Sequence, residues 1–317
     1  MKNIKRAYIT GTTGAVGMAL IKQCIENDID AYVIIRPDSG RADRIPQSDK
    51  VHVIKATLDE LVCLDEKIFE KTDTEPESAF FHLAWMGTTG DARNDMDMQN
   101  KNVEYALDAV TLASKLKCAV YVGAGSQAEY GRVEGCLRPD TPTHPENGYG
   151  IAKLRAGEET RIRCNQLGLR HIWVRILSVY GPYDNERSVI ISTIRRLLAG
   201  ETPPLTLGEQ MWDFMYSMDA AKAMMALASK AMTDEKVSGK VYPLGSGVAA
   251  PLKNYIEQLK DAIDPRLNLG FGEVPYGPKQ VMHLQADITA LKEATGYVPD
   301  TSFSDGIKET IRWCKNV

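Results

Sequence analysis

The sequence predicts an α/β fold in which a doubly wound parallel sheet is followed by a smaller, mixed C-terminal lobe. In residues 1–180, short strands alternate with helical segments, and strands rich in Val, Ile and Ala along their whole length are typical of a parallel sheet covered on both faces. A series of prolines from Pro182 to Pro278 divides the rest into shorter elements. We therefore expect two units, residues 1–180 and 181–317, with the second crossing back to the sheet and packing on its edge.

The expected strands are short apolar runs, each followed by a turn or a helix. They lie at Arg6–Thr10, Ala31–Ile35, Val51–Lys55, Ala79–Leu83, Ala119–Ala124 and Ile172–Leu177. Helices are expected where apolar residues recur at helical spacing. In the first unit these are Ala15–Asn27, Leu61–Lys71, Asp95–Leu116 and Tyr149–Leu167. In the second they are Val189–Leu198, Met218–Ala231, Leu252–Ala262, Asp287–Thr295 and Phe303–Lys315.

Composition limits the classes of partner. A net charge of -4 provides no basic field for nucleic acid or for an anionic membrane. No apolar run approaches the roughly 20 residues that span a bilayer, and the N-terminus lacks the apolar stretch of a signal peptide. Six scattered cysteines without a C-x-x-C pair are typical of reduced thiols, not of a metal site. We expect a cytoplasmic protein that binds no nucleic acid, membrane or metal.

A glycine-rich turn follows the first strand and opens the first helix. Gly11 allows the tight turn, Gly14 lets the backbone approach a pyrophosphate, and Gly17 lets the helix pack close to the strand. The helix N-terminus offers free N–H groups and a positive dipole end to phosphates. The turn therefore predicts a dinucleotide-binding Rossmann domain in residues 1–180.

The residue after the second strand predicts which dinucleotide binds. NAD-specific sites usually carry Asp or Glu there to accept the ribose hydroxyls, whereas this chain has Arg36. A guanidinium at that place pairs with a 2′-phosphate, and Arg41 and Arg44 lie nearby to assist. This favours NADP(H) over NAD(H).

Three residues form the candidate catalytic group. Tyr149 and Lys153 are four residues apart at the start of a helix, so that phenol and ammonium share one face. A positive charge nearby, from Lys153 and from an oxidised nicotinamide, would lower the pKa of the phenol from its usual value near 10. Ser126 follows the fifth strand, where ligands bind in such sheets, and would hold the substrate oxygen against Tyr149.

These residues carry a family resemblance over nearly all of the chain. The sequence resembles the extended short-chain dehydrogenase/reductase family, in its NAD(P)-dependent group of nucleotide-sugar epimerases and dehydratases. Besides the glycine turn and the catalytic group, the matching segments are 82–85 (His-Leu-Ala-Trp), Asn102, 130–131 (Tyr-Gly), Arg175, 179–182 (Val-Tyr-Gly-Pro), 212–219, 295–299, Phe303 and 306–307.

The resemblance implies roles for further residues. Cofactor contacts would come from Gly11, Thr13, Gly14, Ala15, Val16, Arg36, Leu58, Leu83, Ala84, Trp85, Asn102, Tyr149 and Lys153. Substrate contacts would come from Trp85, Thr88, Gln127, Ser178 and Trp212. The substrate would be a nucleotide sugar bound by the second unit. The family also implies a homodimer, in which Asp95–Leu116 and Tyr149–Leu167 of two subunits form a four-helix bundle.

Two departures from the family's motifs concern the reaction and the substrate contacts. The family's 4,6-dehydratases carry Thr-Asp-Glu where this chain has Ser126, Gln127 and Ala128, and neither an amide nor a methyl group can exchange protons. Glu129, one place further on, would point elsewhere. Many members also pair the diphosphate with Asn and Arg where this chain has Ser178 and Trp212.

The sequence therefore predicts an NAD(P)-dependent nucleotide-sugar epimerase or 4-ketoreductase, and the catalytic group alone does not separate the two. The alternatives are an NADPH-dependent reductase of a non-nucleotide carbonyl substrate, and a protein that binds NADP(H) without catalysis.

Overall fold

The computed structural model describes residues 4–64, 77–133 and 135–317. A seven-stranded sheet, with all neighbours parallel, has the order β12-β7-β5-β4-β1-β2-β3. Its strands are β1 (Arg6–Thr10), β2 (Asp30–Ile35), β3 (Val51–Lys55), β4 (Ser78–His82), β5 (Val120–Ser126), β7 (Arg170–Ile176) and β12 (Lys240–Leu244). This order confirms the doubly wound parallel sheet, and all six expected strands belong to it.

The seventh strand, β12, was not expected from the sequence. It pairs with β7 and lies at the end of the sheet, although Pro243 lies within it. Proline has no N–H to donate to a neighbouring strand. It is therefore tolerated in an edge strand, which pairs on one side only. The second half of the chain thus returns to complete the sheet.

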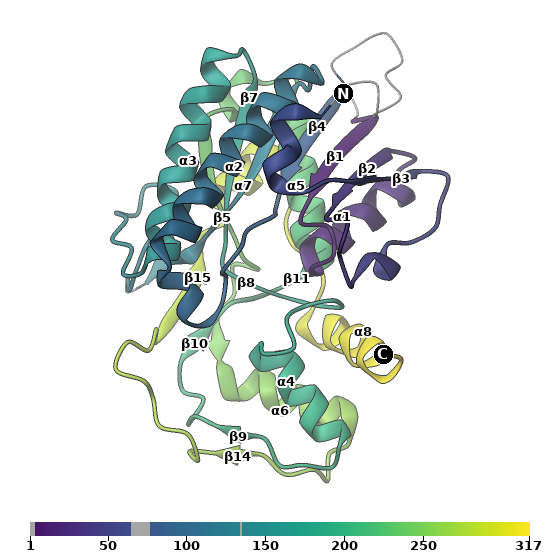
Figure 1. Cartoon of the computed structure of the whole chain (residues 1–317). Coiled ribbons are helices and arrows are strands. Elements are labelled where there is room, and N and C mark those ends of the chain that lie inside the picture. The colour runs from purple at the N-terminus through teal and green to yellow at the C-terminus, as the bar shows by residue number, and fades with distance from the viewer. Residues whose placement is uncertain (1–3, 65–76, 134) are drawn as a thin grey trace.

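Helices cover both faces of this sheet (Figure 1). On one face lie α1 (Ala15–Glu26), α5 (Ser217–Ala231) and α7 (Thr289–Thr295), and on the other lie α2 (Met96–Lys115) and α3 (Gly148–Gln166). Successive strand residues point to opposite faces. Ile9 and Val33 accordingly pack with α1 and α5, whereas Tyr8 and Tyr32 pack beneath α2.

A row of aromatic rings crosses the sheet beneath α2 and α3. The paired residues His52, Tyr32, Tyr8, Phe80, Tyr121 and His171 stack with centroids 4.7 to 6.3 Å apart. A slip of one residue would move a ring to the other face, so this row holds the register of six neighbouring strands.

The remaining elements form a lobe beyond the carboxyl ends of the strands (Figure 1). Helices α4 (Val189–Leu198), α6 (Leu252–Ile263) and α8 (Phe303–Lys315) enclose a core of their own. A mixed sheet has the order β13 (Ala250–Pro251), β10 (Met211–Trp212), β15 (His283–Ala286) and β6 (Cys136–Leu137). Two further pairs join β8 (Ser178–Tyr180) to β11 (Phe214–Tyr216) and β9 (Pro204–Leu205) to β14 (Gly270–Phe271).

The expectation that this lobe packs on the sheet edge was wrong. Leu177 leads from β7 directly into β8, so the chain passes the end of the sheet before the lobe begins. Of the elements after residue 181, only β12 lies at the edge of the seven-stranded sheet, and α5 covers one face of that sheet. The lobe and the strand ends therefore face each other.

Short 3₁₀ turns connect several elements: η1 (Ala42–Arg44), η2 (Leu58–Cys63), η4 (Gly90–Asn94), η5 (Gln127–Glu129) and η6 (Glu235–Val237). The expected helix Leu61–Lys71 begins within η2, and its residues 65–71 lie outside the described part of the chain. The other expected helices are present, and their ends differ by at most two residues. Within the described residues, no helix is long and apolar enough to cross a membrane.

Candidate active site

The glycine turn between β1 and α1 is shaped by backbone contacts. Gly11 has φ 72°, and a Cβ there would lie 2.6 Å from the backbone of Leu83 and Ala84. A Cβ on Gly17 would lie 2.5 Å from the carbonyl oxygen of Gly11. A Cβ on Gly14 would meet nothing within 4 Å, because this residue faces a cavity. No side chain caps α1, so its first N–H groups remain available to an anion.

Two adjoining cavities follow this turn and share Gly11 and Trp85. The larger, about 800 Å³, runs from the turn to the end of β2. The smaller, about 330 Å³, lies at the ends of β4 and β5 beside α3. Of the residues expected to bind cofactor, the larger is lined by Gly11, Thr13, Arg36, Leu58, Ala84 and Trp85. The smaller is lined by Gly14, Ala15, Val16, Leu83, Tyr149 and Lys153.

Asn102 is the one expected cofactor residue that lines neither of these cavities. It is buried on α2, where its amide accepts a hydrogen bond from the N–H of Met86 and donates one to the carbonyl of the same residue. Gln99 accepts a bond from the indole N–H of Trp85 at 2.8 Å. The helix therefore holds the loop after β4, and Asn102 affects the cleft through this loop.

Ser126, Tyr149 and Lys153 all line the smaller cavity. Ser126 ends β5, and its hydroxyl accepts a hydrogen bond from the N–H of Ala128. The Ser126 hydroxyl also lowers the pKa of the Tyr149 phenol, so the two side chains lie close to each other. The fold thus brings the three residues together beside the glycine turn, because β5 ends and α3 begins on the side of the sheet where the strands have their carboxyl ends.

The predicted effect of Lys153 on the phenol is not what the structure shows. Burial raises the pKa of Tyr149, and the groups that oppose this rise are the Ser126 hydroxyl and the Arg93 guanidinium. Arg93, on η4, lies over the phenol ring with its Cζ 4.5 Å from the centroid. The ammonium of Lys153 lies 5.8 Å from that centroid and is engaged elsewhere.

Lys153 is buried, and among the described residues no carboxylate forms a salt bridge with it. Its Nζ donates to the carbonyl of Ala124 at 2.6 Å and lies 3.7 Å from the centre of the Trp85 ring. Only 4% of the residue is exposed, and this burial lowers the pKa of the ammonium to about 7. Burial and the nearby Lys153 also lower the pKa of His82 to about 3, so this histidine is neutral, with Nδ1 bonded to the hydroxyl of Thr10.

The residues expected to bind substrate separate into two groups. Trp85 and Thr88 line the smaller cavity, while Gln127, Ser178 and Trp212 line neither of the two. The indole N–H of Trp212 donates to the hydroxyl of Ser178 at 2.9 Å. These two side chains therefore bond each other between β10 and β8.

Sequence reasoning missed Arg93 and Asp184. Asp184 lines the smaller cavity, and burial raises the pKa of its carboxyl group. Neither residue stands in a motif, since loop packing alone brings them to the cleft. Arg44, expected near a 2′-phosphate, instead donates to the carbonyl of Thr13 and lies over the ring of Tyr183.

Candidate metal ligands do not gather in the part of the chain that the structure describes: no group of three or more His, Cys, Asp or Glu side chains is placed to hold an ion. The six cysteines are all free thiols.

Comparison with known proteins identifies the family. The model of the NAD-dependent epimerase/dehydratase family matches residues 7–245. The chain belongs to this family. It is therefore an NAD-dependent enzyme of the extended short-chain dehydrogenase type, as its resemblance implied. A putative UDP-glucose 4-epimerase of Methanocaldococcus jannaschii is 26% identical, over 97% of this chain and 98% of that protein.

Other relatives agree in length and fold. A UDP-N-acetyl-alpha-D-glucosaminuronate decarboxylase of Bacillus cytotoxicus is 25% identical, over 99% of this chain and 98% of that one. The structure of the UDP-N-acetylglucosamine 4-epimerase of Methanobrevibacter ruminantium superposes with a TM-score of 0.84, at 23% identity, over 99% of both chains. The UDP-glucuronic acid 4-epimerase of Bacillus cereus, in complex with NAD, gives 0.81 at 19% identity, over 98% and 99%.

The burial of Lys153 predicts an unusual pH dependence of stability. Between about pH 7 and pH 10 the unfolded chain holds one more proton at this residue than the folded chain, because an exposed lysine has a pKa near 10.4. The free energy of unfolding of the wild type, relative to Lys153→Met, should rise by about 1.4 kcal/mol per pH unit there. Urea unfolding of cofactor-free protein at pH 7, 8 and 9 measures it. A constant difference would mean that Lys153 stays charged.

Proposed function

We propose that this enzyme is a nucleotide-sugar epimerase that inverts a hydroxyl-bearing carbon by way of a keto intermediate. The observation that carries the proposal is that Ser126, Tyr149 and Lys153 line one cavity, which opens onto the glycine turn. Relatives named as UDP-sugar 4-epimerases match nearly the whole chain, which supports a UDP-sugar as substrate.

The chain's own residues supply the proton chemistry. Tyr149 takes the hydroxyl proton as the sugar carbon is oxidised, and returns it to the oxygen after the keto-sugar has turned over. Ser126 holds that oxygen with its hydroxyl. A bound NAD-type dinucleotide supplies hydride acceptance and donation. Its pyrophosphate would lie at Gly14 and its nicotinamide in the smaller cavity, beside Lys153.

Dehydration does not fit this site. At the positions of a dehydratase acid and base stand Gln127 and Ala128, which do not exchange protons at neutral pH. The next carboxylate along the sequence, Glu129, turns away from the cavity and into the sheet, where it bonds Trp173 and Arg175. Asp184 lines the smaller cavity, but it follows β8 and does not stand at the position of a dehydratase acid or base.

A second candidate, reduction of a 4-keto-sugar by NADPH, is favoured by the end of the larger cavity. Arg36, Ser39 and Arg41 line it, and the side chain of Arg36 is 67% exposed. Two guanidinium groups and a hydroxyl suit a 2′-phosphate, which favours NADP(H) over NAD(H). Asp38 lines the same cavity and suits the ribose hydroxyls of NAD(H) instead. Epimerisation requires only that the dinucleotide stays bound.

We also propose a homodimer. On the outer side of α3, Ile151 and Ile162 are 45% and 51% exposed, and eleven residues place them three helical turns apart on one face. The pair of Arg155 and Glu159 lies between them, so this surface mixes apolar and charged contacts. Together with α2 it would form the predicted four-helix bundle.

Replacing Tyr149 tests the proposed chemistry. Tyr149→Phe removes only the hydroxyl and should lower kcat by about 10²- to 10⁴-fold, with cofactor binding unchanged. Conversion of UDP-glucose, UDP-N-acetylglucosamine and UDP-glucuronic acid would be followed by chromatography without added cofactor. Tyr276→Phe, in the lobe and outside both cavities, is the matched control. Full turnover by Tyr149→Phe would contradict the mechanism. No conversion of these sugars, together with stoichiometric oxidation of NADPH when a UDP-4-keto-sugar is supplied, would favour the reductase.

Replacing Arg36 tests the choice of dinucleotide. If the 2′-phosphate lies against it, Arg36→Ala should weaken NADPH binding by about 10- to 100-fold, the worth of a charge-assisted hydrogen bond, and leave NADH binding unchanged. Calorimetric titration measures both, with Arg312→Ala on the distant α8 as control. An equal effect on the two cofactors, or none, would assign the site to NAD(H).

Light scattering tests the dimer. The wild type should have twice the mass of the 35.1 kDa chain, and Ile162→Glu, which places a charge in the proposed interface, should be monomeric. A wild-type protein of single mass at micromolar concentration would rule the interface out.

A further inference from the structure

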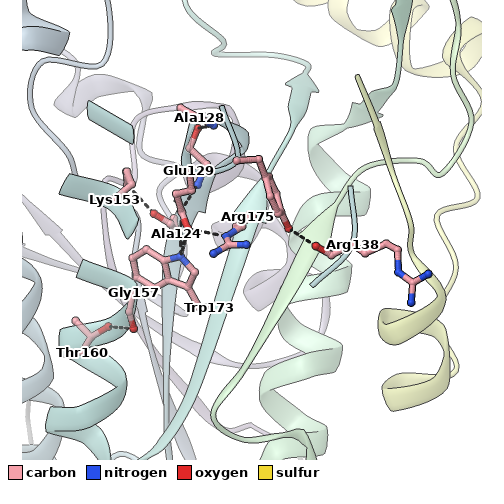
Figure 2. Close-up of polar contacts among 11 residues, drawn as sticks. Ala124, Ala128, Glu129, Arg138, Lys153, Gly157, Thr160, Trp173 and Arg175 are labelled. Carbon is pink, nitrogen blue, oxygen red and sulfur yellow. Dashed lines mark hydrogen bonds and ion pairs between the residues drawn. The ribbon is translucent and has the colours of Figure 1, made fainter. Parts of the chain in front are cut away.

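A buried ion pair lies directly behind the strand end that carries Ser126. Glu129 and Arg175 are 0% and 5% exposed, and Oε2 of Glu129 lies 2.6 Å from Nε of Arg175. The same carboxyl group accepts the backbone N–H of Ser126 at 2.8 Å and the indole N–H of Trp173 at 3.1 and 3.2 Å (Figure 2). Every one of these partners is a donor, so the group must be ionised to satisfy them.

The backbone around this carboxylate leaves room for the indole that supports it. A Cβ on Gly123 or Gly125, both in β5, would lie 2.4 or 2.3 Å from Trp173, and one on Gly157 in α3 would lie 2.8 Å from it. At Gly125 a Cβ would also lie 2.3 Å from Oε1 of Glu129. Three glycines on two elements thus let the ring reach the carboxylate, and the pair is a built part of this end of β5.

The carboxylate acts on both titrating groups of the cavity. Its negative charge opposes the fall that burial causes in the pKa of Lys153, and adds to the rise that burial causes in that of Tyr149. Lys153 donates to the carbonyl of Ala124, two residues before Ser126 on the same strand (Figure 2). The other charged or titratable groups packed around this strand end and its cavity are Arg175 on β7, His82 on β4, Tyr130 after η5, Arg93 on η4 and Asp184 after β8.

The pair also connects the strand end to the lobe. The guanidinium of Arg175 lies over the ring of Tyr130, 4.4 Å from its centroid, and the hydroxyl of Tyr130 donates to the carbonyl of Arg138 at 2.8 Å. Arg138 directly follows β6, which pairs with β15 in the mixed sheet. A shift of that sheet would therefore act on Arg175 and Glu129 before it reached Ser126.

We propose that Glu129 is a positioning residue for the reaction: it fixes the end of β5 so that Ser126 meets Tyr149, and its buried negative charge opposes the loss of the proton from Lys153. Burial as an ion pair is not itself evidence of added stability, since such pairs often contribute little to it. Three donors converging on one carboxylate beside the reacting hydroxyl instead provide rigidity and charge at the place where both are needed.

Two substitutions separate these roles. Glu129→Gln keeps an oxygen for Ser126 and Trp173 but removes the charge; it should lower kcat by about 10- to 100-fold with KM nearly unchanged, and move the alkaline limb of the pH profile down by about one unit. Glu129→Asp keeps the charge but shortens the side chain, so kcat should fall while the alkaline limb of the pH profile stays in place.

The matched control is Asp219→Asn. Asp219 is a buried carboxylate on α5, 1% exposed, that accepts bonds from Tyr297 and Thr301 and lines neither cavity. It should lose stability and keep the wild-type pH profile. If Glu129→Gln leaves Arg175 unpaired and the chain does not fold, Glu129→Gln with Arg175→Met removes both charges and is measured in its place. A profile and kcat equal to those of Asp219→Asn would overturn the proposal.

The kinetic measurement rests on the proposed function, but a second one needs no substrate. Lys153→Met is made in the wild type and in Glu129→Gln, or in the double variant, and urea unfolding is followed from pH 5 to 9 in cofactor-free protein. The free energy of unfolding relative to Lys153→Met begins to rise at a certain pH. That pH should be about one unit lower without the Glu129 charge. The same onset in both backgrounds would overturn the proposed charge effect, even if no nucleotide sugar were turned over.

Discussion

The contact of backbone on backbone at the glycine turn is the constraint on which the rest of the cleft depends. Gly11 lies against the chain that leaves β4, and Gly17 lies against Gly11, at separations that no side chain would permit. These contacts bring the start of α1 beside the loop that carries Trp85. Because Trp85 lines both cavities and lies under the Lys153 ammonium, the same contact joins the larger cavity to the candidate catalytic residues.

The site is electrostatically unusual before any ligand is bound. Burial shifts the pKa values of Tyr149 and Lys153 in opposite directions, and both shifts favour the neutral form. A base needs the reverse, a phenolate beside a cation. The carboxylate behind the strand and the guanidinium over the phenol each favour part of that charged state, so protein charges oppose the effect of burial.

Most of the sheet and the catalytic group could be predicted because each depends on local pattern. Six strands followed from apolar runs, and Ser126 meets Tyr149 because parallel strands end at one edge. β12 was missed because it is an edge strand that contains Pro243, which resembles a loop in sequence. Arg93, Asp184 and the place of the lobe depend on long-range packing, which leaves no local pattern. Glu129 was expected to point away from the cavity, and does, but its partners on β7 were not foreseeable from spacing.

The late return of the chain to the sheet affects how the protein is made. The face of the sheet that carries Ile9 and Val33 is covered in part by α5, and its outer strand is β12, both of which are synthesised after residue 216. When only the first 180 residues have emerged from the ribosome, the nascent chain therefore exposes an apolar sheet face without α5 and an open edge of β7 without β12. Such surfaces and strand edges pair with other chains, so the nascent enzyme is prone to aggregate until its last third emerges.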